Sequence, residues 1–121
     1  MTKAILTVDD STSLRLLLRE ALTEAGHKVA EAGDGLAALE WLATNRPQLV
    51  ITDITMPQLD GLALIAELRA RDDMRDIPIL VLSTESAPES KARARAAGAT
   101  GWIAKPFDPA KLNSAIRLVM H

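Results

Sequence analysis

The sequence contains no cysteine and no tyrosine, and only one phenylalanine and two tryptophans. Without cysteine the chain can form neither disulfides nor thiolate-ligated zinc sites, and catalysis by a thiolate is excluded. Basic residues are not in excess, because the 14 lysines and arginines are outnumbered by 16 aspartates and glutamates. A protein that binds nucleic acid through its phosphates normally has the opposite balance, so we expect no nucleic-acid partner.

Long hydrophobic runs are also missing. The first apolar run, Ala4–Val8, is followed at once by two aspartates and is too short for a signal peptide or a membrane span. We therefore expect a cytoplasmic protein without a membrane segment. The 121 residues, of which 48% are hydrophobic and 25% charged, match the size and composition of one globular domain over residues 1–121.

Short β-rich runs alternate five times with stretches that have the period of an amphipathic helix. Two of these runs are continuously apolar, as in strands that helices cover on both faces. Five β–α units on so short a chain predict a parallel sheet with helices on both sides, although periodicity does not fix the strand order. The expected strands are Ala4–Val8, Lys28–Ala30, Leu49–Thr52, Ile79–Leu82 and Trp102–Ala104, and the first helical stripe is Leu14, Leu17, Leu18, Ala21, Leu22 and Ala25.

Capping residues mark the expected helix boundaries. Asp34 and Asp60 are placed to cap the beginnings of two helices, because a short acidic side chain accepts from free backbone N–H groups. Gly26 and Gly98 are placed at helix ends, and Pro47 is expected to close the second helix.

Polar side chains follow the predicted strands at their carboxyl ends. Asp9 and Asp10 follow the first strand, Asp53 the third, Ser83 the fourth and Lys105 the fifth. In a parallel sheet these ends lie at one edge, where doubly wound proteins bind ligands. Carboxylates ~4 Å apart repel by about 4 kcal/mol per pair at an effective dielectric of 20, so the cluster requires cations. Lys105 supplies one, and an all-oxygen ligand set favours Mg²⁺ as another.

Each of these residues also has a purely structural interpretation. Asp9 and Asp10 could cap the following helix, Asp53 and Ser83 could be turn or cap residues, and Lys105 could be an exposed loop lysine. Taken together, however, the acidic, hydroxyl and basic groups fall on different strand ends, and the two most apolar strands have no polar residue in their middle. This joint pattern favours a functional site.

Four motifs spread along the whole chain carry a resemblance to a known family. The chain resembles the receiver domains of two-component response regulators, and within them the stand-alone chemotaxis regulators of the CheY type. The resemblance implies a flavodoxin-like, doubly wound α/β fold, with a five-stranded parallel sheet of order 2-1-3-4-5 and five helices. The motifs are residues 7–11 (TVDDS), 51–57 (ITDITMP) with Asp60-Gly61, 82–85 (LSTE) and 98–107 (GATGWIAKPF).

The resemblance also assigns roles. Asp53 is implied to take a phosphoryl group from the phosphohistidine of a histidine kinase, here of the chemotaxis CheA type. Asp10, Asp53 and the backbone carbonyl of Thr55 would ligate Mg²⁺, with Asp9 acting nearby, largely through water. Lys105 would pair with Asp53 and then with the phosphoryl oxygens. The implied protein is a signalling receiver that catalyses only its own phosphorylation and dephosphorylation.

Further positions are implied to convert phosphorylation into a signal. Ser83 would bond a phosphoryl oxygen, and Trp102, at the position of the family's switch aromatic, would turn inward and reshape the surface of the fourth helix, fifth strand and fifth helix. Thr55 and Glu85 would tune the lifetime of the phosphoryl group. The same resemblance implies a cis bond between Lys105 and Pro106.

Lys91 and Arg95 lie one turn apart on the predicted fourth helix. A solvated helix face is the simplest interpretation of this pair. The functional alternative is a docking surface, shared with Trp102, for an acidic segment of a partner such as a flagellar motor switch protein. We expect the protein to be a monomer.

Two other functions remain open from the sequence. A lone receiver could be a phosphate sink or a phosphorelay intermediate instead of a motor regulator. A small Mg²⁺-dependent phosphohydrolase using Asp53 is less well supported, because such enzymes normally have a second aspartate two residues after the nucleophile, where this chain has Thr55.

Overall fold

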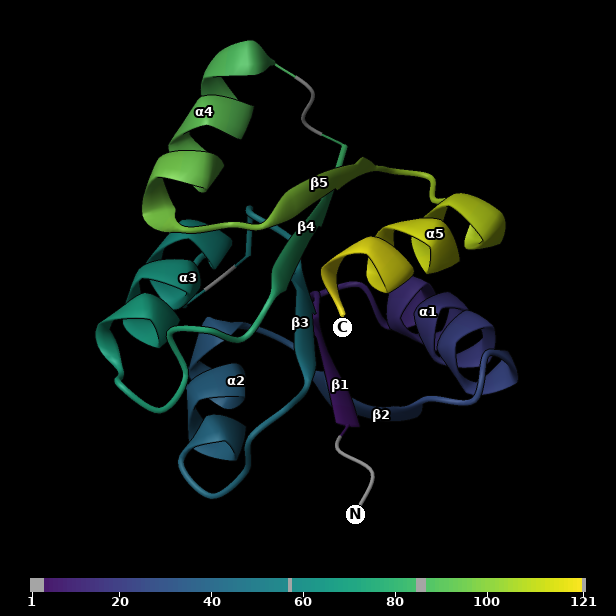
Figure 1. Ribbon diagram of the computed structural model, residues 1–121, viewed down its shortest axis with the longest axis horizontal. Coiled ribbons are helices and arrows are strands. Elements are labelled where there is room, and N and C mark those ends of the chain that lie inside the picture. The colour runs from purple at the N-terminus through teal and green to yellow at the C-terminus, as the bar shows by residue number, and fades with distance from the viewer. Residues whose placement is uncertain (1–3, 57, 85–86, 121) are drawn as a thin grey trace.

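Five parallel strands form a single sheet in the order β2-β1-β3-β4-β5 (Figure 1). The computed structural model describes residues 4–56, 58–84 and 87–120. The order confirms the expected flavodoxin-like, doubly wound fold. The strands are β1 (Ala4–Val8), β2 (Lys28–Ala32), β3 (Leu49–Thr52), β4 (Ile79–Ser83) and β5 (Gly101–Ala104), and the helices are α1 (Thr12–Glu24), α2 (Gly35–Leu42), α3 (Gly61–Ala70), α4 (Pro88–Ala97) and α5 (Pro109–Val119).

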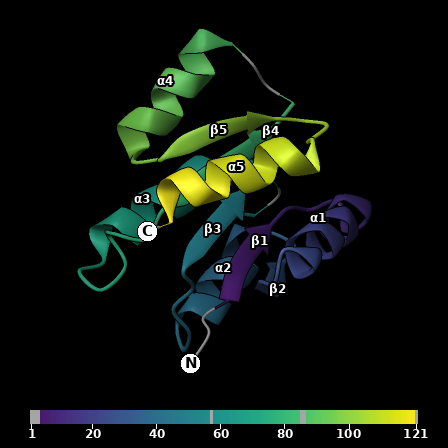
Figure 2. The same cartoon turned by 45° about the vertical axis from the view of Figure 1, so that its right-hand side comes forward.

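The sheet separates two hydrophobic cores. Helices α1 and α5 cover one face, and α2, α3 and α4 cover the other (Figures 1 and 2). Successive residues of a strand point to opposite faces. In β1, Ile5 therefore packs in the α1–α5 core with Leu18, whereas Leu6 packs in the other core with Leu64. Burial on both faces explains why the central strands are continuously apolar. In the described part of the chain, no helix has the length and apolar character needed to cross a membrane.

Two of the predicted helix N-caps are confirmed, and the N-cap of α1 is a different residue from the aspartates considered for it. Asp34 and Asp60 cap α2 and α3, each accepting a hydrogen bond from a backbone N–H three residues later. Helix α1 is capped by Ser11, whose hydroxyl accepts from the backbone N–H of Leu14 at 3.2 Å. Because Ser11 fills this position, the aspartates before it are not the cap of α1.

Two glycines lie at helix C-termini as predicted, but the predicted proline does not. Gly98 caps α4 in a left-handed conformation with φ of 118°, which is accessible to glycine at little cost. Gly26 follows the C-cap of α1 and has a φ of 92°. Pro47 does not close α2, because that helix already ends at Leu42 and the proline lies in the following loop.

The predicted apolar stripe of α1 is only partly buried. Leu18 and Leu22 are fully buried, but the side chain of Leu17 is 54% exposed. Leu17 lines an open groove that also contains Phe107 and Pro109. The stripe is therefore wider than the contact between α1 and the sheet.

Arg69 connects α3 to the end of α4 and to the loop before β4. Its Nε donates to the carbonyl oxygen of Gly98 at 2.9 Å, and Nη1 donates to the carbonyls of Arg75 at 2.9 Å and Ile77 at 2.7 Å. Burial lowers the pKa of the Arg69 guanidinium, and the nearby Asp76 offsets only part of that effect. The side chain also fills the space that a Cβ on residue 98 would need.

Candidate functional site

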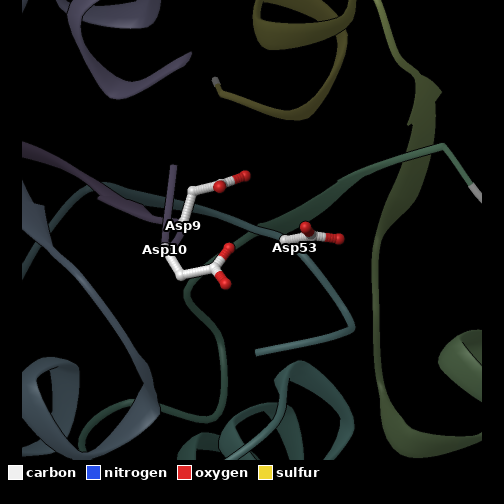
Figure 3. A group of neighbouring side chains, drawn as sticks. All are labelled: Asp9, Asp10 and Asp53. Atoms are coloured by element: carbon white, nitrogen blue, oxygen red, sulfur yellow. The ribbon is translucent and has the colours of Figure 1, made fainter. Parts of the chain in front are cut away.

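Three aspartates gather where β1 and β3 end. The two strands are parallel neighbours, with Val8 paired to Thr52, so the residues after them lie side by side (Figure 3). One oxygen from each of the Asp9, Asp10 and Asp53 carboxylates lies within 4.8 Å of the others. This is the clustering expected from the sequence.

Lys105 places a positive charge among these carboxylates. Its Nζ atom donates to Asp9 Oδ2 and to Asp53 Oδ2, each at 2.9 Å. Burial lowers the pKa of the ammonium, but the hydrogen bonds and negative charges of Asp53 and Asp9 outweigh that effect and raise the pKa above the usual lysine value. Lys105 follows β5, and its peptide bond to Pro106 is cis, as expected. The lysine is therefore not an exposed loop residue: its side chain is 15% exposed.

Asp53 is held by hydrogen bonds of both its backbone and its side chain. Its N–H donates to the carbonyl of Val8 at 3.0 Å, and its carbonyl accepts from the Thr52 hydroxyl at 2.9 Å. The N–H of Ile54 donates to Oδ1 at 2.7 Å, and Lys105 binds Oδ2. Because each carboxylate oxygen has two lone pairs, both oxygens retain the capacity to bind a further group.

Gly61, the first residue of α3, packs directly against the backbone of Asp53. Its N–H donates to the carbonyl of Ile54 at 2.8 Å. A Cβ at this position would lie 2.0 Å from the Asp53 carbonyl oxygen. Gly61 is part of a motif quoted from the sequence, but its role in seating Asp53 was not predicted.

Asp9 and Asp10 have different environments despite being neighbours. Asp9 is 2% exposed, and its carboxylate accepts from the Ser11 N–H at 2.8 Å and from Lys105. Asp10 is exposed, and within the described ranges no group donates a hydrogen bond to its carboxylate. The cluster therefore combines two oriented carboxylates with one open carboxylate. This all-oxygen donor set fits a hard divalent cation such as Mg²⁺.

Ser83 lies next to Lys105, which directly follows β5. It is the last residue of β4 and 3% exposed, and its carbonyl oxygen accepts from the Lys105 N–H at 2.9 Å. Thr55, two residues after Asp53, is exposed. Glu85, the other residue expected to tune the phosphoryl lifetime, lies outside the described residues.

Lys91, Arg95 and Trp102 meet around one small cavity between α4 and β5. They line this space of about 50 Å³ together with residues 94 and 99–101. The indole of Trp102 is half-buried and packs against the α2–α3–α4 core, and Trp41 packs there too. Among the described residues, no hydrogen-bond partner reaches the buried Nε1 atom of Trp102.

Comparison with known proteins agrees with this geometry. Residues 5–117 match the family model described as "Response regulator receiver domain". The response regulator MprA of Mycobacterium sp. (strain KMS) is 38% identical over 121 residues, which are 100% of this chain and 52% of MprA. The chain thus spans about half the length of the curated relatives it matches.

Solved structures give the same result. Chemotaxis protein CheY4 of Vibrio cholerae superposes with a TM-score of 0.93 at 37% identity, over 98% of this chain and 99% of that one. The receiver domain of a histidine kinase from Syntrophus aciditrophicus superposes with a TM-score of 0.90 at 33% identity, over 98% of this chain and 90% of that one. The chain belongs to the response regulator receiver domain family, whose members are signalling modules that accept phosphoryl groups from histidine kinases.

Proposed function

We propose that this chain is a receiver domain in which Asp53 accepts a phosphoryl group from a kinase phosphohistidine. The observation that carries the proposal is the position of Lys105, whose Nζ bridges Asp9 and Asp53 at 2.9 Å each. The open Asp10 carboxylate lies within 4.8 Å of both partners. This arrangement supplies a nucleophile, a fixed cation and carboxylate oxygens able to ligate a metal ion at one point.

The transfer would proceed by displacement at phosphorus. A carboxylate oxygen of Asp53 forms the new O–P bond as the N–P bond of the phosphohistidine breaks, and the donor imidazole takes up a proton from solvent. Asp10, Asp53 and the carbonyl of Thr55 would hold Mg²⁺, with Asp9 contributing through water, and the ion would neutralise charge on the phosphoryl oxygens. Lys105 would then pair with a phosphoryl oxygen, which makes it a catalytic residue.

Ser83 and Trp102 are proposed to transmit the modification. Ser83 would donate its hydroxyl to a phosphoryl oxygen, and Trp102 would turn inward in response. The location of Trp102 supports this role, because the indole lines the cavity between α4 and β5 and packs against the α2–α3–α4 core. In a Trp41→Phe background, phosphorylation should shift the Trp102 emission to shorter wavelength. An unchanged spectrum in fully phosphorylated protein would contradict this role.

We further propose a role in chemotaxis, with an acidic segment of a flagellar motor switch protein as the target. The structural similarity to CheY4 supports it, as does the joint location of Lys91, Arg95 and Trp102 at one cavity. Phosphorylated protein should bind the motor protein more tightly than unmodified protein. Charge reversal at Lys91 and Arg95 should weaken that binding and leave phosphorylation intact.

Failure of motor binding would instead favour a phosphate sink or a phosphorelay intermediate. The phosphohydrolase alternative is weaker, because Thr55 stands where a second aspartate would act, and it would require turnover of small phosphate esters. The proposal includes a monomeric state and a cytoplasmic location, where a CheA-type kinase would be the donor.

Phosphotransfer tests the proposal. An autophosphorylated, isotope-labelled histidine kinase of the chemotaxis type should pass its label to the wild type and not to Asp53→Asn. Asp72→Asn is a matched control, because Asp72 is a fully exposed aspartate in the loop between α3 and β4, at the opposite edge of the sheet from the acidic cluster, and it should accept label. Equal labelling of Asp53→Asn would refute Asp53 as the acceptor.

A further inference from the structure

Arg15, in the first turn of α1, links two segments beside the acidic cluster. Its Nε donates to Glu31 Oε1 at 3.2 Å, and its Nη1 donates to the backbone carbonyl oxygen of Asp9. The side chain is 18% exposed, and Glu31, on β2, also accepts from Arg19 Nε at 2.6 Å. The guanidinium is therefore fixed between the end of β1 and β2.

The carbonyl that Arg15 binds belongs to the peptide joining Asp9 to Asp10. Because a peptide unit is planar, the hydrogen bond from Arg15 to its carbonyl also fixes the direction of the Asp10 N–H. The bond thereby limits rotation of the whole peptide plane between Asp9 and Asp10. Lys105 and the N–H of Ser11 orient the Asp9 carboxylate. The Asp10 carboxylate has no such partner in the described part of the chain, so the backbone alone directs it toward the cluster.

We propose that Arg15, anchored by Glu31, is the positioning residue for the Asp10 carboxylate and so sets the affinity of the acidic cluster for a divalent cation. The inference rests on the metal site of the proposed function. A guanidinium suits this role because its rigid fork can donate to the Glu31 carboxylate and the Asp9 carbonyl at once, which one ammonium cannot reproduce. Loss of such an outer partner typically weakens metal binding by about 10–100-fold.

The direction of the change in metal affinity distinguishes a positioning role of Arg15 from a purely electrostatic one. Arg15 is a cation near a cation site, so removing its charge alone would strengthen the binding of a divalent ion. Loss of positioning has the opposite effect, because Asp10 would then sample orientations that face away from the other carboxylates. Weaker binding in Arg15→Ala therefore cannot come from the lost charge.

The test measures metal binding directly, without a phosphoryl donor. Titration calorimetry with Mg²⁺ and electron paramagnetic resonance with Mn²⁺ should give a dissociation constant about tenfold higher for Arg15→Ala than for the wild type. Arg15→Lys should lie between them. Arg19→Ala is the matched control, because Arg19 also pairs with Glu31 but donates its other hydrogen bond to the carbonyl of Val29 and not to that of Asp9. It should lose stability but keep the wild-type metal affinity.

A double-mutant cycle adds a second, independent criterion. If Glu31 acts through Arg15, Glu31→Ala should weaken metal binding in the wild type and have no further effect in Arg15→Ala. If Arg15→Ala does not fold, the metal affinities of Arg15→Lys and Glu31→Ala are compared with that of the wild type instead. Unchanged or tighter metal binding in folded Arg15 variants would overturn the inference and leave the proposed function standing. A wild type that binds no divalent cation would overturn both.

Discussion

Lys105 Nζ donates to Asp53 Oδ2 at 2.9 Å, although the two residues are 52 positions apart and follow strands separated by β4. The same ammonium also binds Asp9, which follows β1. One side chain therefore joins the ends of three strands and supplies positive charge to a cluster of carboxylates. We expect both the stability of this edge of the sheet and its proposed chemistry to depend on that contact.

The first prediction concerns Lys105→Met in metal-free protein. The substitution should lower the free energy of unfolding by about 1–3 kcal/mol at neutral pH, because it leaves two carboxylates without their shared donor. The pKa of Lys105 is raised in the folded state. The stabilisation from the Lys105 contacts is therefore complete below the ordinary lysine pKa of about 10.4. It is lost as the pH rises through the higher pKa that Lys105 has in the folded protein.

Urea unfolding of both proteins from pH 7 to 11 checks this expectation. The difference in free energy should be constant near neutral pH and shrink in the alkaline range. The chain has no tyrosine or cysteine, so other lysines are the only further side chains that titrate there. Lys111→Met, at an exposed position, should show little difference at any pH. A difference that grows with pH would contradict the pairing.

Gly61→Ala should displace Asp53, the proposed phosphoacceptor. The new methyl group would lie 2.0 Å from the Asp53 carbonyl oxygen, and relieving such overpacking typically costs about 1–3 kcal/mol. Both the free energy of unfolding and the rate of phosphorylation by acetyl phosphate should fall. Gly33→Ala is the control, because its Cβ would make one ordinary contact, 3.5 Å from Arg15. Equal rates in wild type and Gly61→Ala would refute this role.

Arg69→Met should destabilise the fold without affecting the chemistry. It leaves three backbone carbonyls without their donor, which we expect to cost about 2–3 kcal/mol. Denaturant unfolding should detect this loss, while phosphorylation of the folded protein should keep its rate. Arg71→Ala, next to the end of α3, is the control and should cost much less. A stability equal to that of the wild type would show that water replaces the guanidinium without loss.

Substitution of Thr55 or Glu85 should change the lifetime of the phosphoryl group. Both lie two residues beyond a residue proposed to contact that group, where a side chain can admit or exclude the attacking water. After removal of the phosphoryl donor, the decay rate of Thr55→Ala or Glu85→Ala should differ from that of the wild type, although phosphorylation itself still occurs. Matching decay rates would exclude this role.

Much of the fold and the site could be predicted because both follow from strand burial. Continuous apolar runs indicate strands covered on both faces, and parallel strands bring Asp9, Asp53 and Lys105 to one edge whatever lies between them. The strand order could not be obtained this way, because periodicity carries no information about which strands are neighbours. It came from the family resemblance.

Contacts between a side chain and a distant backbone group were missed. Arg69 and Arg15 each bind backbone carbonyls, and a carbonyl is present at every residue, so no residue type marks such a partner. Leu17 shows a related limit. Helical period identified its apolar stripe correctly but could not tell how much of that stripe the sheet would cover.

The central claim is that Asp53, within a cation-dependent acidic cluster, is the phosphoacceptor. Intact mass spectrometry after incubation with acetyl phosphate and Mg²⁺ tests it most directly. The wild type should gain the mass of one phosphoryl group, and neither Asp53→Asn nor wild type treated with a chelator should gain it. Modification of Asp53→Asn to the same extent, or a folded wild type that stays unmodified with Mg²⁺ present, would contradict the account.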